Sequence, residues 1–294
     1  MIKLNNLTKE KLTNLYIDEK KSLEDIARLY KVSRVAIYNK IKKYGIKQRS
    51  KSEARIEAQK QGKLPQQFFD INENFFSSWS PEMAYVLGLI ITDGCISRTG
   101  RVSLSMNDNE LLEKVKKVMG SEHKIEPSKH QKGLYYFHFA REKLVEDLRK
   151  FGIFPRKSLT VKFPDVPQDF LTHFIRGVFD GDGTVYFDKR GRNYPIRTGL
   201  YSGSKDFIEK LEYNLTKLGL PKRNISQQKT KNGIYYGIRY GHYDSLKLFH
   251  ILYKKAKNGL FLERKYRCFL EGSKRSLEGG ESTGKGAGGM VQAA

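Results

Sequence analysis

The segments VLGLIITDG, Val86–Gly94, and IRGVFDGDG, Ile175–Gly183, are two versions of one pattern. Each is an apolar run with a glycine in its middle, and each ends in Asp-Gly. The segments after each run also repeat in order: a basic hairpin pattern, an amphipathic segment (NELLEKVKKVMG or KDFIEKLEYNLTKLG) and an aromatic strand pair. Two such units in one chain indicate an internal pseudo-two-fold axis. We therefore predict that one acid from each half, Asp93 and Asp182, lies near a common axis.

Both apolar runs are predicted to be helices. The first is predicted to begin at residues 80–82, where Ser-Pro-Glu provides a capping hydroxyl, a proline at the first helical position and an acid in the first turn. The second is predicted to begin near Pro167. Each helix is predicted to end at its aspartate, with the next residue, Gly94 or Gly183, in the left-handed conformation.

The mid-helix glycines, Gly88 and Gly177, remove side chains from the apolar faces, so the two helices can pack closely and bring Asp93 and Asp182 together. Both acids would lie at helix C-termini, where the helix dipole adds negative charge. Two like charges about 4 Å apart repel by about 4 kcal/mol at an effective dielectric near 20. A divalent cation would offset this repulsion. Carboxylate, water and phosphate oxygens are the ligands that suit Mg²⁺.

At these residues the sequence resembles the LAGLIDADG homing endonucleases, in the arrangement with two motifs on one chain. The resemblance covers about residues 76–272. The second motif keeps both glycines and the final acid. The first has Ile91 where the family more often has an acid, but that position is not the catalytic one. A short apolar motif occurs once by chance, whereas two copies at matching places in a repeat are specific.

The resemblance implies an α+β fold in which two αββαββα repeats, residues 76–165 and 166–272, form a saddle that straddles double-stranded DNA. It implies a monomeric, site-specific, Mg²⁺-dependent endonuclease that cuts both strands of a long target and leaves short 3′ overhangs. It also implies a basic residue near each scissile phosphate, for which Lys157 and Lys265 are selected by position. The implied metal site consists of Asp93, Asp182, Gly94 and Gly183.

The hairpins alternate polar and apolar residues around basic turns, so one face of each can pack on helices while the other meets DNA. For any single basic residue, contact with phosphate or solvent is the commoner outcome than recognition of a base. The predicted DNA contacts of the two repeats are Arg98, Arg101, Lys129, Lys132, Lys189, Arg190, Arg192, Arg197, Lys229 and Lys231.

Residues 1–46 form a separate helical pattern. Ser33 is placed to cap a helix from Arg34 to Tyr44 that carries Val35, Ile37 and Ile41, and Ile37 and Ile41 are predicted to be core residues. The segment resembles a helix-turn-helix of the resolvase and transposase type, which would place this helix in the major groove. The alternative is a helical bundle used only for protein contacts. The predicted DNA contacts of this helix are Arg34, Tyr38, Asn39 and Lys42.

Two further segments are predicted to lack a fold of their own. Residues 47–75 are polar and basic and are predicted to be a linker, either with Arg49 against DNA or as a solvated tether. Residues 273–294 are rich in glycine and are predicted to be a flexible tail.

Composition favours a polyanionic partner. The 294 residues include 55 Lys and Arg against 32 Asp and Glu, a net charge of +23, and 12% aromatic residues argue against disorder. The charge is spread along the chain instead of along one amphipathic helix, which favours double-stranded DNA over a membrane surface. Two cysteines imply no disulfide framework, and no apolar run approaches the length of a membrane span. A cytoplasmic protein that acts on DNA is expected.

The sequence leaves two other functions open. One is a transcription regulator that binds DNA without cutting it, because a helix-turn-helix joined to this saddle also resembles a group of bacterial regulators. Those proteins have usually lost the acids, and this chain has both Asp93 and Asp182. The other is a maturase that binds intron RNA through the same basic surface.

Overall fold

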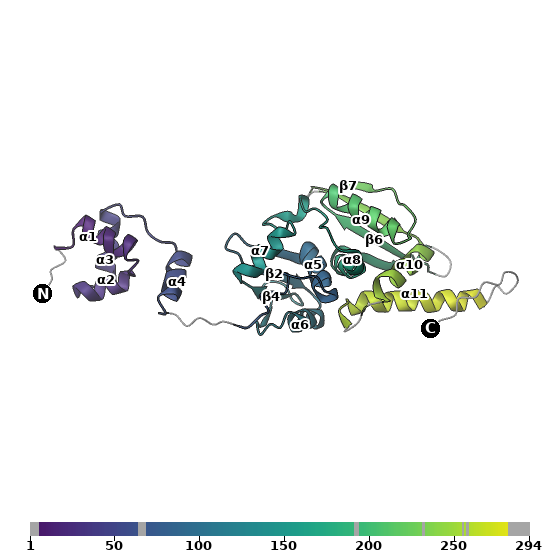
Figure 1. The fold of residues 1–294 in the computed structure, drawn as a ribbon, viewed down its shortest axis with the longest axis horizontal. Coiled ribbons are helices and arrows are strands. Elements are labelled where there is room, and N and C mark those ends of the chain that lie inside the picture. The colour runs from purple at the N-terminus through teal and green to yellow at the C-terminus, as the bar shows by residue number, and fades with distance from the viewer. Residues whose placement is uncertain are drawn as a thin grey trace. The chain divides into compact units, whose positions relative to one another are not determined.

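The protein is described by a computed structural model that covers residues 6–63, 69–190, 194–230, 233–254, 256 and 259–281. The chain divides into two compact units, Met1–Phe68 and Phe69–Ala294 (Figure 1). Arg192 and Lys231, two of the predicted DNA contacts, and residues 282–294 of the predicted tail lie outside the described residues. In the described part of the chain no helix is long and apolar enough to cross a membrane.

The N-terminal unit is a small helical domain around a core of its own, formed by residues such as Leu12, Ile26 and Ile37. A capping box between Ser22 and Asp25 starts the helix Leu23–Tyr30, and Lys31 ends it in the left-handed conformation at φ 54°. Its helices are α1 (Lys9–Thr13), which continues as a π-helical turn η2 (Asn14–Asp18), α2 (Leu23–Tyr30), α3 (Arg34–Lys43) and α4 (Lys51–Lys60).

One prediction for this unit is confirmed and another is corrected. Ile37 and Ile41 are fully buried, as expected for core residues, whereas Val35 on the same helix is 64% exposed. The reason is helical spacing: a residue two positions from Ile37 lies on the opposite face of α3. In the predicted linker, residues 51–60 form α4, because Ser50 and Glu53 cap its first turn reciprocally and the segment is rich in good helix formers.

The second unit contains the two predicted αββαββα repeats, which confirms the fold class. The first repeat consists of α5 (Pro81–Asp93), β1 (Gly94–Ile96), β2 (Val102–Met106), α6 (Asn109–Val118), β3 (Ile125–Pro127), β4 (Tyr135–Phe139) and α7 (Glu142–Lys150). A 3₁₀ turn, η3 (Lys157–Leu159), precedes the second repeat. That repeat consists of α8 (Gln168–Asp182), β5 (Thr184–Phe187), β6 (Ile196–Ser202), α9 (Lys205–Lys217), β7 (Ser226–Thr230), β8 (Gly233–Tyr240) and α10 (His242–Tyr253), followed by α11 (Glu263–Glu281).

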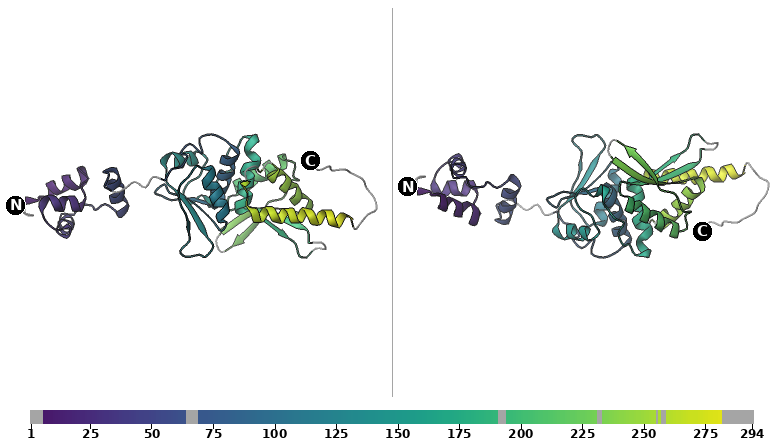
Figure 2. Two further views of the ribbon diagram at one scale, coloured as in Figure 1. Left: turned by 90° about the horizontal axis from the view of Figure 1, so that it is seen from below. Right: turned by 90° about the horizontal axis from the view of Figure 1, so that it is seen from above.

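Each repeat forms one four-stranded antiparallel sheet, in the order β1-β2-β4-β3 or β5-β6-β8-β7. The motif helices α5 and α8 pack against each other at the centre of the unit, between the two sheets (Figures 1 and 2). Strand alternation turns one face of each sheet towards the helices, as in β2, where Val102, Leu104 and Met106 are buried.

The close approach of α5 and α8 depends on their central glycines, as predicted. A Cβ atom on Gly88 would lie 2.4 Å from the carbonyl oxygen of Phe174, and one on Gly177 would lie 2.1 Å from that of Tyr85. Both distances are far shorter than any real carbon–oxygen contact. Only glycine at both positions allows the two helix backbones to touch.

The glycines after the acids act differently from the prediction. Gly94 and Gly183 are not left-handed helix caps, because their φ/ψ angles are −87°/151° and −74°/154°, and each leads straight into a strand. Their requirement is space: a Cβ on either would lie 2.5 Å from the carbonyl oxygen of the residue four positions earlier, Ile90 or Phe179. The chain turns from helix to strand with no room for a side chain.

The last helix is longer than expected, since α11 continues to Glu281 instead of ending at residue 272. Gly272 is the position where this helix crosses β6, because a Cβ there would lie 2.8 Å from the Ile196 side chain. Gly272, the last residue before the predicted tail, is therefore part of a helix–sheet contact.

Candidate active site

The structure brings the two predicted acids together. Asp93 is the last residue of α5 and Asp182 the last residue of α8. The Asp93 carboxylate reaches the opposite motif, because its Oδ2 atom lies 3.2 Å from the position that a Cβ on Gly181 would occupy. Gly181 thus provides the space in which the acid of the first half meets the backbone of the second.

Burial raises the pKa of both acids. Desolvation, and then the charge of Asp182, raises the pKa of Asp93 to about 6. Desolvation also raises the pKa of Asp182, although its side chain keeps contact with solvent. Lys157 and Lys265 act in the opposite direction on both carboxyls. The centre therefore holds more negative charge than its environment stabilises, which suits a site for a cation.

The two predicted lysines lie directly behind the acids. Lys157 is 5% exposed, and its Nζ donates to the carbonyl oxygen of Gly94 at 2.6 Å. Lys265 is 2% exposed, and its ammonium caps the C-terminal turn of α8. Its acceptors include the carbonyl oxygens of Phe179 at 2.6 Å, Asp180 at 2.8 Å and Gly183. Burial lowers the pKa of both lysines, that of Lys265 to about 8.

These ammonium groups offset the negative C-terminal ends of the motif helices. Lys265, with several carbonyl acceptors, is more firmly anchored than Lys157. The carbonyl oxygens of Gly94 and Gly183, which the resemblance implied as metal ligands, accept hydrogen bonds from these lysines here.

Asp180, two residues before Asp182, forms a buried polar network whose partners the sequence did not predict. It is 1% exposed and occupies the position of Ile91 in the first motif. It accepts hydrogen bonds from the hydroxyls of Tyr85 and Tyr253 and from the backbone N–H of Leu262, at 2.9, 2.6 and 2.9 Å. Burial raises its pKa. The carboxyl thus ties α8 to the segment that carries Lys265.

Arg176, one turn earlier on α8, supports the same segment. It is 1% exposed and donates to the carbonyl oxygens of Leu260 and Leu252 at 3.0 and 3.1 Å. Its guanidinium also lies over the Tyr85 ring, 5.0 Å from the centroid. The sequence signal was an Arg and an extra Asp four residues apart inside an otherwise apolar motif.

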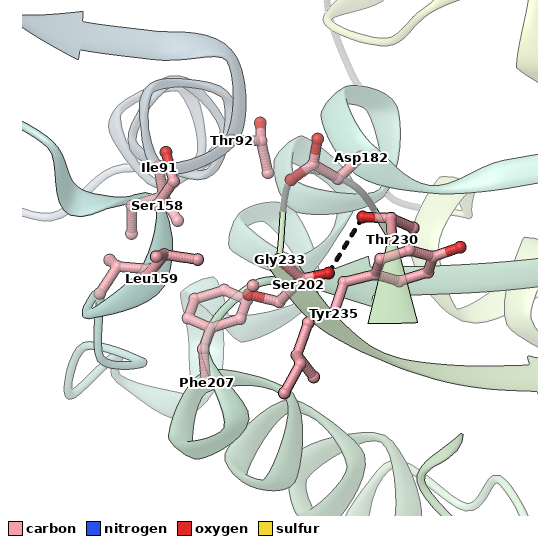
Figure 3. Close-up of a pocket in the computed structure, with 13 residues that line it drawn as sticks. Ile91, Thr92, Ser158, Leu159, Asp182, Ser202, Phe207, Thr230, Gly233 and Tyr235 are labelled. Carbon is pink, nitrogen blue, oxygen red and sulfur yellow. Dashed lines mark hydrogen bonds between the residues drawn. The ribbon is translucent and has the colours of Figure 1, made fainter. Parts of the chain in front are cut away.

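A cavity of about 330 Å³ opens beside Asp182. Figure 3 shows Asp182 and Thr92, from the ends of the two motif helices, together with Thr230 and Tyr235 of the β7–β8 hairpin. The opposite part of its wall includes Leu159 of η3. The β7–β8 hairpin of the second sheet therefore lines the same cavity as Asp182.

The donor set of the centre fits an oxygen-coordinated divalent cation. Among the described residues no group of three or more His, Cys, Asp or Glu side chains could hold a metal alone. Asp93 and Asp182 provide two carboxylates of raised pKa, and water and substrate phosphate would have to complete the coordination. This composition suits Mg²⁺, which keeps several waters and binds through one or two carboxylates plus phosphates.

Most predicted DNA contacts lie on exposed hairpins or on α3. The side chains of Arg98, Arg101, Lys129, Lys132, Lys189, Arg190 and Lys229 are exposed, and that of Arg197 is half-buried on β6. On α3, the side chains of Arg34, Tyr38, Asn39 and Lys42 are all exposed.

Arg49 differs from the other predicted contacts. Its guanidinium lies over the Tyr16 ring, 4.3 Å from the centroid, and donates to the carbonyl oxygens of Tyr16, Lys20 and Lys21. The side chain fastens the segment before α4 to the helical unit, and it could lie along DNA only by breaking these contacts.

Comparison with known proteins agrees with this architecture. The model of the LAGLIDADG-like domain family matches residues 80–151 and 169–253, more than half of the chain. A model described as a putative helix-turn-helix protein, YlxM/p13 like, matches residues 4–77. The chain belongs to the LAGLIDADG family and carries an N-terminal helix-turn-helix, which confirms the family and the presence of a helix-turn-helix.

Two curated relatives come from Methanocaldococcus jannaschii. A probable translation initiation factor IF-2 is 28% identical over 154 residues, which cover 50% of this chain and 12% of that protein. A replication factor C small subunit is 26% identical over 202 residues, which cover 66% of this chain and 10% of that protein. The chain thus spans about a tenth of the length of these relatives.

The similar solved structures include two homing endonucleases or meganucleases. The LAGLIDADG meganuclease I-AabMI bound to uncleaved DNA has a TM-score of 0.47 at 14% identity and covers 69% of this chain and 93% of that chain. I-DmoI in complex with DNA and Mn has a TM-score of 0.40 at 21% identity and covers 62% of this chain and 98% of that chain.

Proposed function

We propose that this protein is a monomeric, site-specific, Mg²⁺-dependent endonuclease that makes a double-strand break in a long DNA target and leaves short 3′ overhangs. The observation that carries the proposal is the meeting of Asp93 and Asp182 at the ends of α5 and α8, with Lys157 and Lys265 buried behind them. One acid and one lysine per repeat supply two related sets of groups, one for each DNA strand.

The chain's own residues would bind and position the substrate. Asp93 and Asp182 hold the cation, which when bound supplies a Lewis acid and an activated water at the scissile phosphate. Lys157 and Lys265 keep the helix ends from adding to the negative charge around the phosphate. The basic hairpins hold the duplex across the centre by contacts to phosphates and base edges.

The pair of acids favours cleavage over binding alone. A protein that only binds DNA gains nothing from two carboxylates placed at helix C-termini, where they repel each other and the DNA phosphates. Their raised pKa values show that the fold is less stable for holding them ionised. We infer that Asp93 and Asp182 are retained because they act on the substrate, which places the regulator and maturase functions second.

The decisive test is cleavage of a plasmid library with a randomised target in the presence of Mg²⁺. The wild type is expected to linearise plasmids that share one long site. The double variant Asp93→Asn, Asp182→Asn is expected to bind the same site without cutting it. Enrichment by both proteins with no cutting by either would instead support a regulator. Sequencing of the ends tests the overhang, and replacement of Mg²⁺ by EDTA tests the metal.

The N-terminal unit is proposed to lengthen the recognised site, since α3 presents four exposed polar or basic side chains on a domain with its own core. Removal of residues 1–68 is expected to shorten the selected site and to weaken binding by roughly ten- to a thousandfold, because phosphate and base contacts are lost together. Cleavage at saturating protein should survive. Complete loss of cleavage under that condition would show that the two units do not act independently.

A further inference from the structure

The second sheet has one face turned to helices and one face open. Helices α9 and α10 pack against β6 and β8, and the buried side chains of Leu200 and Ile238 point to that side. Because alternate residues of a strand point to opposite faces, Arg197, Tyr201 and Arg239 lie on the other face. This open face is the surface that the proposed function assigns to DNA.

Two glycines on the open face make a flat seat for one aromatic ring. A Cβ on Gly199 would lie 2.6 Å from the Tyr201 hydroxyl oxygen, and one on Gly237 would lie 2.5 Å from the Tyr201 ring. Gly237 is also the cross-strand partner of Tyr201. The Tyr201 ring therefore packs flat against the sheet over both glycines. A side chain at either position would overlap with the ring and displace it from the sheet.

The seated ring orients Arg239. The Nε of Arg239 donates to the Tyr201 hydroxyl oxygen at 3.1 Å, and Gly199 is the cross-strand partner of Arg239. Among the described residues the two terminal nitrogens of Arg239 have no acceptor. Arg239 also lines a hollow of about 440 Å³ on this part of the sheet. The guanidinium is thus held by its inner nitrogen, while its outer edge remains available to a ligand.

Two other arginines near this face, Arg190 and Arg197, bind a carboxylate of the protein itself. Asp188 is 7% exposed, and its two carboxylate oxygens accept hydrogen bonds from Arg190 at 3.1 Å and Arg197 at 2.8 Å. These bonds hold the pKa of Asp188 at about 2. All three guanidinium groups are held through Nε, but the partner of Arg239 is a neutral phenol, so no bonded carboxylate offsets its charge. Arg239 therefore differs from Arg190 and Arg197, which the sequence predicted as DNA contacts.

We propose that Arg239, oriented by Tyr201 on the seat of Gly199 and Gly237, recognises a guanine in the major groove of the target. An arginine fork with both terminal nitrogens free matches the O6 and N7 acceptors of guanine, the commonest specific contact to that base. The inference deepens the proposed function and depends on it for the location of the DNA.

The sheet geometry also places this guanine. Gly199 pairs with Thr184 of β5 on one side and with Arg239 of β8 on the other, so Arg239 lies two strands away from the second residue after Asp182. At about 4.8 Å per strand and about 3.3 Å per residue this is roughly 12 Å. The guanine is therefore expected about three to four base pairs from the catalytic centre, at 3.4 Å per base pair.

The first repeat differs at the matching place. Ser103 pairs with His138 across β2 and β4 in the register that joins Gly199 to Arg239 across β6 and β8. The Ser103 hydroxyl is hydrogen-bonded to Nδ1 of His138, whose ring stacks on Tyr136 with centroids 5.4 Å apart. An imidazole cannot form the two parallel bonds of a guanidinium. The guanine is therefore expected in one half of the target only.

The test is a binding selection from a randomised duplex DNA library with the full-length wild type and with Arg239→Lys. The lysine keeps the charge but not the fork. The wild type is expected to select a guanine at one off-centre position, and Arg239→Lys to lose roughly ten- to a hundredfold of that preference while retaining most of its affinity. Tyr201→Phe, which keeps the ring and removes the acceptor, is expected to weaken the same preference.

A control is Lys210→Gln on α9, which removes one positive charge from the helix-covered side of the sheet and should leave every base preference unchanged. Arg239→Lys with the wild-type base preference at all positions would overturn the inference, and would assign Arg239 to phosphate. Selection of the guanine by a wild type that never cuts would keep the inference and reject the nuclease. A wild type that selects no sequence would reject both. Circular dichroism melting verifies that each variant is folded.

Discussion

The Asp93→Asn protein is expected to lose double-strand cleavage altogether and, at the same time, to be more stable than the wild type when no metal is present. The carboxylate is a proposed metal ligand, so its loss should reduce the rate of cutting by at least about a thousandfold, on the scale of losing a main catalytic group. The stability effect has a separate cause, because the pKa of Asp93 is raised from 3.8 to about 6.

The pH dependence is a consequence of that shift. Below pH 3.8 the group is protonated in both folded and unfolded chains, so it costs nothing. As the pH rises from 3.8 to about 6, the unfolded chain ionises more readily than the folded one, and stability falls. Above about pH 6 the loss is complete. After allowance for solvent screening at a half-buried site, it is on the order of 1–2 kcal/mol.

Thermal melting in EDTA at pH 8 and at pH 5 measures this difference. Asp93→Asn is expected to melt higher than the wild type at pH 8, with a smaller gap at pH 5. Added Mg²⁺ should stabilise the wild type and not the variant. Asp165→Asn removes the same charge from an exposed loop and should show neither effect. A variant that melts below the wild type at both pH values would contradict the proposed repulsion.

The acids were predictable because the sequence repeats. Two copies of one apolar motif fix the position of each aspartate by helix length and by the glycine after it, and the mid-helix glycines indicate how closely the helices approach. The lysines were predictable from the family resemblance, which places a basic residue after each second hairpin and helix. The structure finds Lys157 and Lys265 at the helix ends, bonded to carbonyl oxygens that no sequence pattern would specify.

The features that the sequence did not predict depend on contacts between residues that are far apart in the chain. Asp180 looked like a spare acid in a degenerate motif, because its partners Tyr85, Tyr253 and Leu262 come from three other segments. The orientation of Arg239 depends in the same way on a register between strands and on two glycines that no local pattern distinguishes from turn glycines. Local signals did predict where helices begin, yet α4 was missed because its charged residues resembled a linker.

The second large effect, a loss of both stability and cleavage, is expected when one methyl group is added where α5 and α8 touch. In Gly177→Ala the new methyl group would lie 2.1 Å from the carbonyl oxygen of Tyr85 and 3.1 Å from the Cα of Gly88. Both neighbours are backbone atoms of α5, so no rotation of a side chain relieves the overlap. The helices would have to separate, and the expected loss of stability is at least about 3 kcal/mol, at the upper end for overpacked cores.

Such a separation would also move Asp93 away from Asp182, because each acid is rigidly attached to the end of its motif helix. Gly177→Ala is therefore expected to lose cleavage even at a temperature where it remains folded, whereas a simple loss of stability would spare activity below the melting transition. Gly241→Ala is the matched control. A Cβ there has its nearest neighbour at 3.9 Å, and the cost should stay below about 1 kcal/mol as for other glycine helix caps. The melting transition of residues 1–68, which have their own core, should be unchanged in both variants. If Gly177→Ala melts and cuts like the wild type, the contact between α5 and α8 is not what sets the distance between the two acids.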